Sequence, residues 1–237
     1  YEDYLFFIAY AIKRVDAERI KLDEIDMAVG KNFVLTYRHN HIEELEVVKN
    51  AFKSKINHFH KNASTLFYTI IDNMVDGYQV VIENFDLKID EFGDQIFKDP
   101  SRSESIIALT SIKERLTKIR SIVVAEEAIF LNTSKGFYSI LNEQENIFFK
   151  DIYDHLNKIL DKIDRQGNTI SNLLLAQMNL STQKLNELIN FLTIISAILL
   201  PANLIAGIYG MNFHKMPHLE DPSGFYITIL IMFLVAI

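Results

Sequence analysis

A long uncharged segment near the carboxyl end constrains this chain more than any other feature. No charged residue occurs from Leu188 to Phe213, and apolar side chains dominate as far as Tyr209. A bilayer core requires about 20 consecutive apolar residues in a helix, so residues 188–209 are predicted to form a transmembrane helix. A second apolar run, 225–237, is too short for a full crossing. We interpret it as the beginning of a second span in a chain that is cut at both ends.

The remainder of the chain is polar. Charged residues make up 23% of the sequence, the mean hydropathy is only +0.09 and the formal net charge is −7. This acidity argues against nucleic acid as a partner, because phosphate binding needs a basic face. The absence of cysteine excludes disulfides and thiolate metal sites. We find no nucleophile with its base, no phosphate-binding loop and no zinc-hydrolase motif, so we do not expect an enzyme.

The amino-terminal part is predicted to be a piece of a small α/β domain, residues 1–62. Three runs rich in β-branched and aromatic residues, 4–12, 20–29 and 33–37, indicate strands, the last two joined by a connection that contains Gly30. A helix over residues 42–59 should cover the resulting sheet.

Residues 63–185 are predicted to form a stalk of long helices. Apolar residues spaced by threes and fours predict an amphipathic helix from Leu66 to Ile96 that stops at Asp99-Pro100. A second helix is expected over 102–131. A third begins near Asn142 and meets no proline before Pro201, so it should continue into the first transmembrane helix. The transmembrane domain is then 186–237, with an outer loop at 210–224.

One face of the first transmembrane helix carries polar and small residues at intervals of seven. Amide and hydroxyl groups in lipid need partners, so this face should meet other helices or water. Pore lining is favoured for Asn186 and Asn203, whereas for Thr193, Ser196 and Gly207 close helix packing remains an equal alternative. Heptad spacing also predicts a symmetric bundle. The two rows are Asn186, Thr193, Leu200, Gly207 and Ile189, Ser196, Asn203, Gly210.

The end of this helix carries a family resemblance. The sequence 205–213, which contains Gly210-Met211-Asn212 and is followed by Met216-Pro217, resembles the CorA-type magnesium/cobalt transporters, the GMN-motif family of divalent metal ion transporters. The similarity extends back through 151–155 and 71–76. It implies an α+β multi-pass membrane protein with two transmembrane helices, in which five identical chains form a cytoplasmic funnel. It also implies that the protein lies in a prokaryotic inner membrane with most of the chain in the cytoplasm.

The resemblance assigns roles around the loop. Asn212 would contact hydrated Mg²⁺ through water, Tyr209 and Met211 would shape the selectivity loop, and Gly210 would allow its turn. Magnesium gives up its water reluctantly, so a ring of neutral amides can bind the hydration shell without holding the ion too tightly. Deeper in the pore, the resemblance places Asn186, Leu192, Leu200 and Asn203, with the two leucines as apolar constrictions.

The outer loop departs from the usual family pattern. His214 and His218 stand where acidic residues are frequent, so attraction of cations would depend on Glu220 and Asp221. Imidazole suits cobalt, nickel and zinc. A changed metal preference and a pair of solvated histidines are both left open.

A regulatory site is implied at Asp151. In the resemblance it corresponds to an aspartate that binds cytoplasmic magnesium between neighbouring subunits and holds the pore closed. Asp154 lies one turn away, and a divalent cation would offset the repulsion between such acidic faces. A solvated helix face that also includes Asp161 and Asp164 is the alternative. The acidic partner is expected among Glu43, Glu44 and Glu46.

The leading functional hypothesis is a pentameric channel that passes hydrated Mg²⁺, with Co²⁺ and Ni²⁺ as further candidates, and that cytoplasmic Mg²⁺ closes. A zinc transporter of the same superfamily is one alternative, and a membrane-anchored coiled-coil scaffold or signalling protein is another. The polar residues Asn186, Asn203 and Asn212 favour the pore over a mere anchor. A carboxylate cluster of Glu126 and Glu127 with Asp72 and Asp76 lacks the Glu-x-x-His pattern of di-iron proteins.

Overall fold

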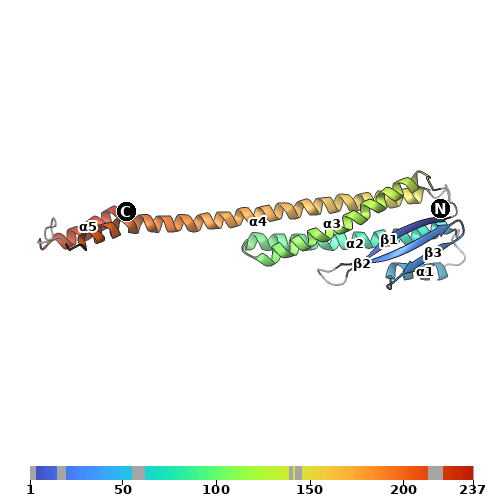
Figure 1. Cartoon of the computed structure of the whole chain (residues 1–237), viewed down its shortest axis with the longest axis horizontal. Helices are drawn as coiled ribbons and strands as arrows, with labels where there is room; N and C mark the ends of the chain where they lie inside the picture. The colour runs from blue at the N-terminus through green and yellow to red at the C-terminus, as the bar shows by residue number, and fades with distance from the viewer. Residues whose placement is uncertain are drawn as a thin grey trace. The chain divides into compact units, whose positions relative to one another are not determined.

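The computed structural model describes residues 4–14, 20–54, 62–138, 141, 146–212 and 221–236. The chain divides into two compact units, Tyr1–Gln177 and Met178–Ile237, and each is described by itself. Figure 1 shows the elements in order: β1 (Tyr4–Arg14), β2 (Ile20–Gly30), β3 (Val34–Arg38), α1 (Glu43–Ser54), α2 (Ala63–Lys98), α3 (Ser103–Ser134), α4 (Asn146–Tyr209) and α5 (Gly224–Ala236).

The predicted strands and long helices are confirmed, with ends that shift by a few residues. α1 ends at Ser54, earlier than predicted. α2 begins after Asn62, whose side chain accepts a hydrogen bond from the Thr65 backbone N–H at 2.8 Å, as N-cap residues do. After α3, Gly136 has φ +75, a left-handed conformation that favours glycine. α4 is continuous over 64 residues and contains Pro201, as the sequence predicted.

The strands form an antiparallel sheet in the order β1-β2-β3. Cross-strand partners include Phe7 with Met27 and Ala9 with Ile25, and all four side chains are buried. Successive side chains of a strand point to opposite faces, so this face is the inner one, and α2 packs against it. The opposite face exposes apolar side chains, namely Phe6, Ile8, Leu35 and Tyr37.

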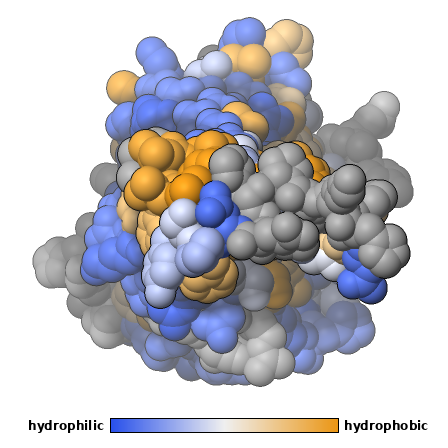
Figure 2. Space-filling view, turned by 90° about the vertical axis from the view of Figure 1, so that its left-hand side faces the viewer, coloured by the Kyte–Doolittle hydropathy of each residue, from blue (hydrophilic) through white to orange (hydrophobic). Residues whose placement is uncertain are grey.

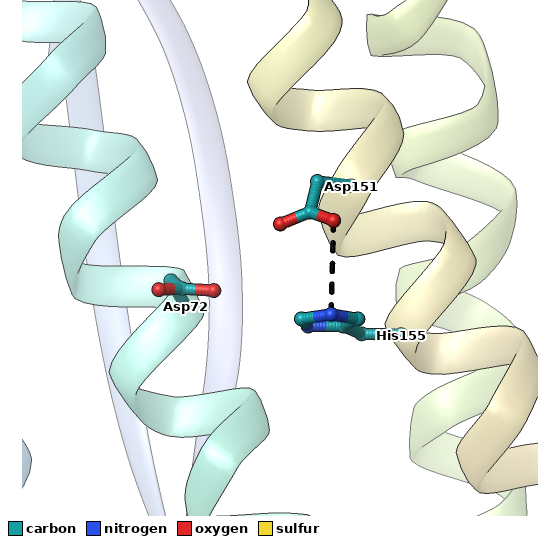
Figure 3. Close-up of side chains that lie close together, drawn as sticks. All are labelled: Asp72, Asp151 and His155. Carbon is teal, nitrogen blue, oxygen red and sulfur yellow. Dashed lines mark ion pairs between the residues drawn. The ribbon is translucent and has the colours of Figure 1, made fainter.

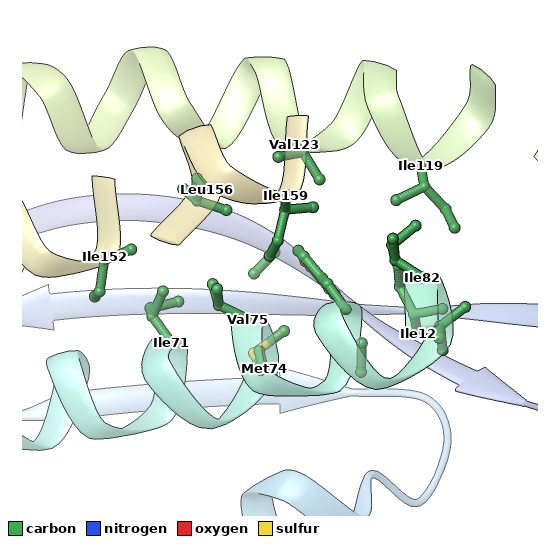
Figure 4. Close-up of a cluster of buried hydrophobic side chains, with 14 of the residues drawn as sticks. Ile12, Ile71, Met74, Val75, Ile82, Ile119, Val123, Ile152, Leu156 and Ile159 are labelled. Atoms are coloured by element: carbon green, nitrogen blue, oxygen red, sulfur yellow. The ribbon is translucent and has the colours of Figure 1, made fainter. Parts of the chain in front are cut away.

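The core of the first unit joins α2, α3 and the first part of α4. Figure 4 shows side chains of the three helices meeting, with Ile12 of β1 beside them. The buried positions follow helical spacing, as amphipathic helices require. The labelled members are Ile71, Met74, Val75 and Ile82 from α2, Ile119 and Val123 from α3, and Ile152, Leu156 and Ile159 from α4.

Two glutamines of α4 tie this helix to the α2–α3 hairpin. The buried Gln166 donates from Nε2 to the Ile82 carbonyl at 2.8 Å and to Asp86 Oδ1 at 2.5 Å. Eleven residues later, Gln177 donates to the Pro100 carbonyl, between α2 and α3, at 2.8 Å. These bonds help to fix the axial position of α4, because they join it to atoms of the hairpin that are far apart from it in sequence.

The second unit consists of the rest of α4 and α5, and its apolar side chains are uncovered. Leu188, Phe191 and Leu192 are each about two-thirds exposed. Among the described residues, α4 is the one helix long and apolar enough to cross a membrane, while Gly224–Val235 is a shorter apolar helix. In the end-on view of Figure 2, hydrophobic residues gather at the front of the molecule.

An aromatic cluster offers a direct test of how the start of α4 is held. Phe149 is fully buried, with its ring centroid 5.8 Å from that of Phe67 and 6.3 Å from that of Phe130. We expect Phe149→Ala to lower the free energy of unfolding by about 3–5 kcal/mol, the usual cost of such a cavity. Phe97→Ala is the control because Phe97 is 61% exposed, and it should change the value by about 0.5 kcal/mol or less. Denaturant unfolding followed by circular dichroism would measure both, and equal effects would contradict the assignment.

Candidate functional site

Three potential metal ligands converge where α2 and α4 lie side by side. Asp72 comes from α2, whereas Asp151 and His155 come from α4, and Figure 3 shows the three side chains turned toward one another. One ligand atom from each lies within 4.8 Å of the others. Asp151 Oδ1 is 3.7 Å from His155 Nε2. The group is therefore compact enough for one ion to contact all three residues.

Helix geometry explains this arrangement. Asp151 and His155 are four residues apart, so they share one face of α4. Their neighbours Phe149 and Ile152 are buried, which turns the Asp151 side chain to the flank of the helix, where it is 52% exposed. Asp72 follows the buried Ile71 in the same way and is half-buried. The core on either side thus brings these polar groups together at the edge of the helix pair.

The electrostatics of the site are those of crowded negative charge. Partial burial raises the pKa of Asp72, and the neighbouring carboxylates of Asp76 and Asp151 raise it further, while His155 acts in the opposite direction. Nearby, the pKa of Tyr68 is raised to about 12, first by burial and then by Asp72, Asp151 and Asp76. Burial is the largest cause of both shifts, and the neighbouring carboxylates add a negative potential that a bound cation would relieve.

The donor set suits a divalent cation. Carboxylate oxygens are the preferred protein ligands of Mg²⁺, which keeps several waters and takes few protein ligands. An imidazole nitrogen adds affinity for cobalt, nickel or zinc. The exposure of Asp151 leaves room for water or for a ligand from another chain in the remaining positions.

The sequence identified only part of this site. Asp151 was the predicted ligand, and its spacing to His155 could have identified the histidine as well. The stretch 71–76 was singled out, but Asp72 was not chosen as a ligand. Its approach to Asp151 depends on how α2 packs against α4, which local patterns do not reveal.

One of the predicted acidic partners of Asp151 is paired with basic side chains of this chain. Glu46 pairs with Arg38 at 2.6 Å and with Lys49 at 3.4 Å. Glu43 and Glu44 stand with it in the first turn of α1, and none of the three is in the Asp72 cluster. A role opposite Asp151 of a neighbouring chain therefore stays a prediction. The alternative carboxylate cluster is not formed by the described residues, because Glu126 is buried against Tyr78 instead.

The predicted pore residues lie on an uncovered part of α4. Leu192 and Leu200 are 64% and 67% exposed, and Asn186 and Asn203 are exposed as well. The hydroxyl of Thr193 donates to the Ile189 carbonyl at 2.8 Å, and Ser196 is half-buried. A Cβ atom added at Gly207 would have no neighbour within 4 Å among the described residues. Their roles in a pore stay predictions, since pore lining depends on further copies of the chain.

The Gly210-Met211-Asn212 segment directly follows Tyr209, the last residue of α4. The Gly210 N–H donates to the Ala206 carbonyl at 2.9 Å, and a Cβ atom on Gly210 would come within 3.1 Å of that oxygen. Glycine therefore permits the tight end of the helix. Met211 and Asn212 are exposed.

The outer loop is described only at its ends. His214, His218 and Glu220 lie outside the described residues. Asp221 is exposed, and its carbonyl accepts from the Gly224 N–H at 2.9 Å at the start of α5. A hollow of about 330 Å³ lies between Asp221, Tyr209 and the first turns of α5.

Comparisons with known proteins identify relatives of this chain and of its fold. Residues 1–237 match the family described as CorA-like Mg2+ transporter protein. The chain is 26% identical over 239 residues to the cobalt/magnesium transport protein CorA of Thermotoga maritima, which covers 100% of this chain and 68% of the relative. The solved structure of the Methanocaldococcus jannaschii CorA magnesium transporter superposes with a TM-score of 0.88 at 19% identity, covering 99% of this chain and 74% of that one. Full-length CmaX superposes with a TM-score of 0.80 at 18% identity, covering 99% and 71%.

The charge crowding at Asp72 leads to a testable stability effect. A raised folded-state pKa means that ionised Asp72 disfavours the folded chain at neutral pH. In the presence of a chelator, Asp72→Asn should therefore raise the thermal unfolding midpoint. This gain should shrink as the pH falls through the raised folded-state pKa and should vanish below the ordinary aspartate value of 3.8, where Asp72 is protonated in both states. Asp90→Asn, on the exposed side of the same helix, controls for the change in net charge, and an equal gain there would contradict the local explanation.

Proposed function

The chain belongs to the CorA-like Mg2+ transporter protein family, and on this premise we propose that it forms a membrane channel for hydrated Mg²⁺. The observation that carries the proposal is α4. A single helix begins beside the Asp72 cluster, continues as an uncovered apolar segment and ends at Gly210-Met211-Asn212. One element thus joins a candidate cation sensor to a candidate cation entrance.

Magnesium and cobalt are the proposed substrates. The relative from Thermotoga maritima is named a cobalt/magnesium transport protein, and the Haemophilus ducreyi relative a magnesium transport protein. The cytoplasmic domain of ZntB from Vibrio parahaemolyticus superposes at 9% identity with a TM-score of 0.63, which supports a shared fold alone. The zinc alternative therefore has less support than magnesium.

The pore requires several copies of the chain. In one chain the α4 face with Asn186, Leu200 and Asn203 has no protein cover, and exposed amides in lipid are costly. A homopentamer in the inner membrane would turn this face to a central pore and leave other apolar residues to lipid. The first unit would lie in the cytoplasm.

Selection at the entrance would depend on amide oxygens. Asn212 is exposed just beyond the last turn of α4, where five copies would form a ring. Neutral oxygens can accept hydrogen bonds from the water shell of Mg²⁺ and release the ion again. Leu192 and Leu200 would provide apolar constrictions, and Asp221, with Glu220, would attract cations to the mouth.

Regulation would use the Asp72 cluster. When cytoplasmic Mg²⁺ is abundant, an ion bound by Asp151, Asp72 and His155, with an acidic partner from the neighbouring chain, would hold the subunits together. When Mg²⁺ is scarce, the carboxylates repel one another. The difference in ion affinity between the closed and open states would supply the coupling free energy.

Flux through the pore tests the proposal. The intact protein in liposomes should pass Mg²⁺, and Asn212→Ala should abolish that flux because it removes the amide ring. Asn172→Ala, an exposed position on α4 outside the apolar segment, should keep the flux. Wild-type liposomes without Mg²⁺ flux would favour the scaffold alternative, and a monomeric particle in detergent would contradict a shared pore.

Inhibition by internal magnesium tests the sensor separately. Asp151→Ala removes one carboxylate of the cluster, so a higher internal Mg²⁺ concentration should be needed to close the pore. Asp154→Ala, one turn away and exposed but outside the cluster, is the matched control. An inhibition curve that Asp151→Ala leaves unchanged would remove this residue from the sensor while leaving the pore assignment intact.

A further inference from the structure

Glu126 is a carboxyl group sealed inside the first unit, away from the Asp72 cluster. It lies on α3 and is only 4% exposed. Its Oε1 atom lies 2.9 Å from the hydroxyl oxygen of Tyr78 on α2. Its Oε2 atom is buried and has no hydrogen-bond partner among the described residues. An ionised carboxylate has about four sites that can accept hydrogen bonds. Most of these sites would have no donor here, and burying a charge in this way is costly.

The hydrogen count at Tyr78 indicates which form of Glu126 is present. The Tyr78 hydroxyl donates to the backbone carbonyl of Tyr10 in β1. A carbonyl oxygen can only accept, so this bond uses the single hydroxyl hydrogen of Tyr78. The hydrogen bond between Tyr78 and Glu126 at 2.9 Å then needs a hydrogen from Glu126. A protonated Glu126 donates to the Tyr78 oxygen and satisfies both contacts at once.

We infer that Glu126 holds a proton in the folded protein. This proton completes a series of hydrogen bonds, from Glu126 to Tyr78 and from Tyr78 to the Tyr10 carbonyl, that links α3 to α2 and to β1. The bound proton completes a network that joins three elements of the core. Tyr78 itself is fully buried, so water does not replace either contact. This role is independent of cation transport and concerns a different group from the Asp72 cluster.

Among the described residues, no cationic side chain is a cause of the raised pKa of Glu126. Burial is the largest cause that raises the pKa of Glu126 to about 8, while Tyr78 and the Tyr10 backbone lower it. No charged group of the described part of α4 is among these causes. The titratable groups that act on the rest of the network are all acidic: Glu24 and Asp26 of β2 act on Tyr10, and Glu44 of α1 acts on Tyr78.

The proton links folding to pH in a defined direction. The ordinary pKa of glutamate is 4.5, whereas that of the folded chain is about 8. Between these values the folded chain keeps a proton that the unfolded chain has released. The stabilising contribution is therefore complete below pH 4.5 and is lost as the pH rises through about 8. Within that window the unfolding constant should rise by up to about tenfold per pH unit.

Glu126→Gln separates the proton from the shape of the side chain. The glutamine amide can donate to the Tyr78 oxygen at every pH, so this variant should lose the pH dependence that Glu126 contributes. For the full chain in detergent, the ratio of wild-type to variant unfolding constants should rise by up to about tenfold per unit between about pH 5 and 8. Glu114→Gln, exposed on the same helix, should follow the wild type. Parallel curves for wild type and Glu126→Gln would overturn the inference.

Infrared difference spectroscopy gives a readout that a merely structural role would not change. The wild type should show the carbonyl stretch of a buried carboxylic acid at neutral pH, which disappears at alkaline pH and is missing in Glu126→Gln. Tyr78→Phe removes the acceptor of that proton, so the band should shift in frequency. If the glutamine variant fails to fold, the wild type and Tyr78→Phe still decide, since a wild type without the acid band at neutral pH would refute the proton site.

Discussion

The aromatic cluster at the start of α4 is the contact on which the rest of the first unit depends. Phe7 of β1, Phe67 of α2, Phe130 of α3 and Phe149 of α4 meet with ring centroids 5.4 to 6.3 Å apart. Four elements distant in sequence thereby share one apolar site. Because Asp151 follows Phe149 by two residues, burial of the phenylalanine sets where the carboxylate emerges. The candidate sensor is in this sense a product of core packing.

The same helix then changes its environment without changing its secondary structure. Up to Ile170 one face of α4 is buried in the first unit, and Gln177 donates a hydrogen bond to the Pro100 carbonyl between α2 and α3. Beyond Met178 the side chains of α4 are mostly exposed, and they become apolar. A continuous hydrogen-bonded helix suits both settings, because it satisfies its own backbone in water and in lipid. One continuous helix thus contains both Asp151 and the apolar segment.

Local sequence patterns were sufficient for the elements but not for the contacts between them. Spacing by threes and fours predicted α2 and α3, and the lack of proline before Pro201 predicted one helix through α4. The approach of Asp72 to Asp151 could not be predicted from periodicity, because it depends on the axial register of two packed helices. The sequence offers Glu126 only as a possible member of a carboxylate cluster, without the Glu-x-x-His pattern of di-iron proteins. Its contact with Tyr78 shows that burial, which a sequence does not state, decides the role of such a carboxyl group.

Asp151 and Glu126 lie in the same unit but differ in their access to solvent. This difference decides which cation can neutralise each carboxylate. Asp151 is 52% exposed, and an ion can reach it with part of its water shell. Glu126 is 4% exposed, with one oxygen that has no partner among the described residues. A hydrated metal ion does not fit there, whereas a proton needs no space and brings a hydrogen-bond donor with it. Crowded acids at the helix edge therefore favour a divalent cation, while a single acid in the core favours a proton. The two sites can then respond to different signals, although residues of α2 contribute to both.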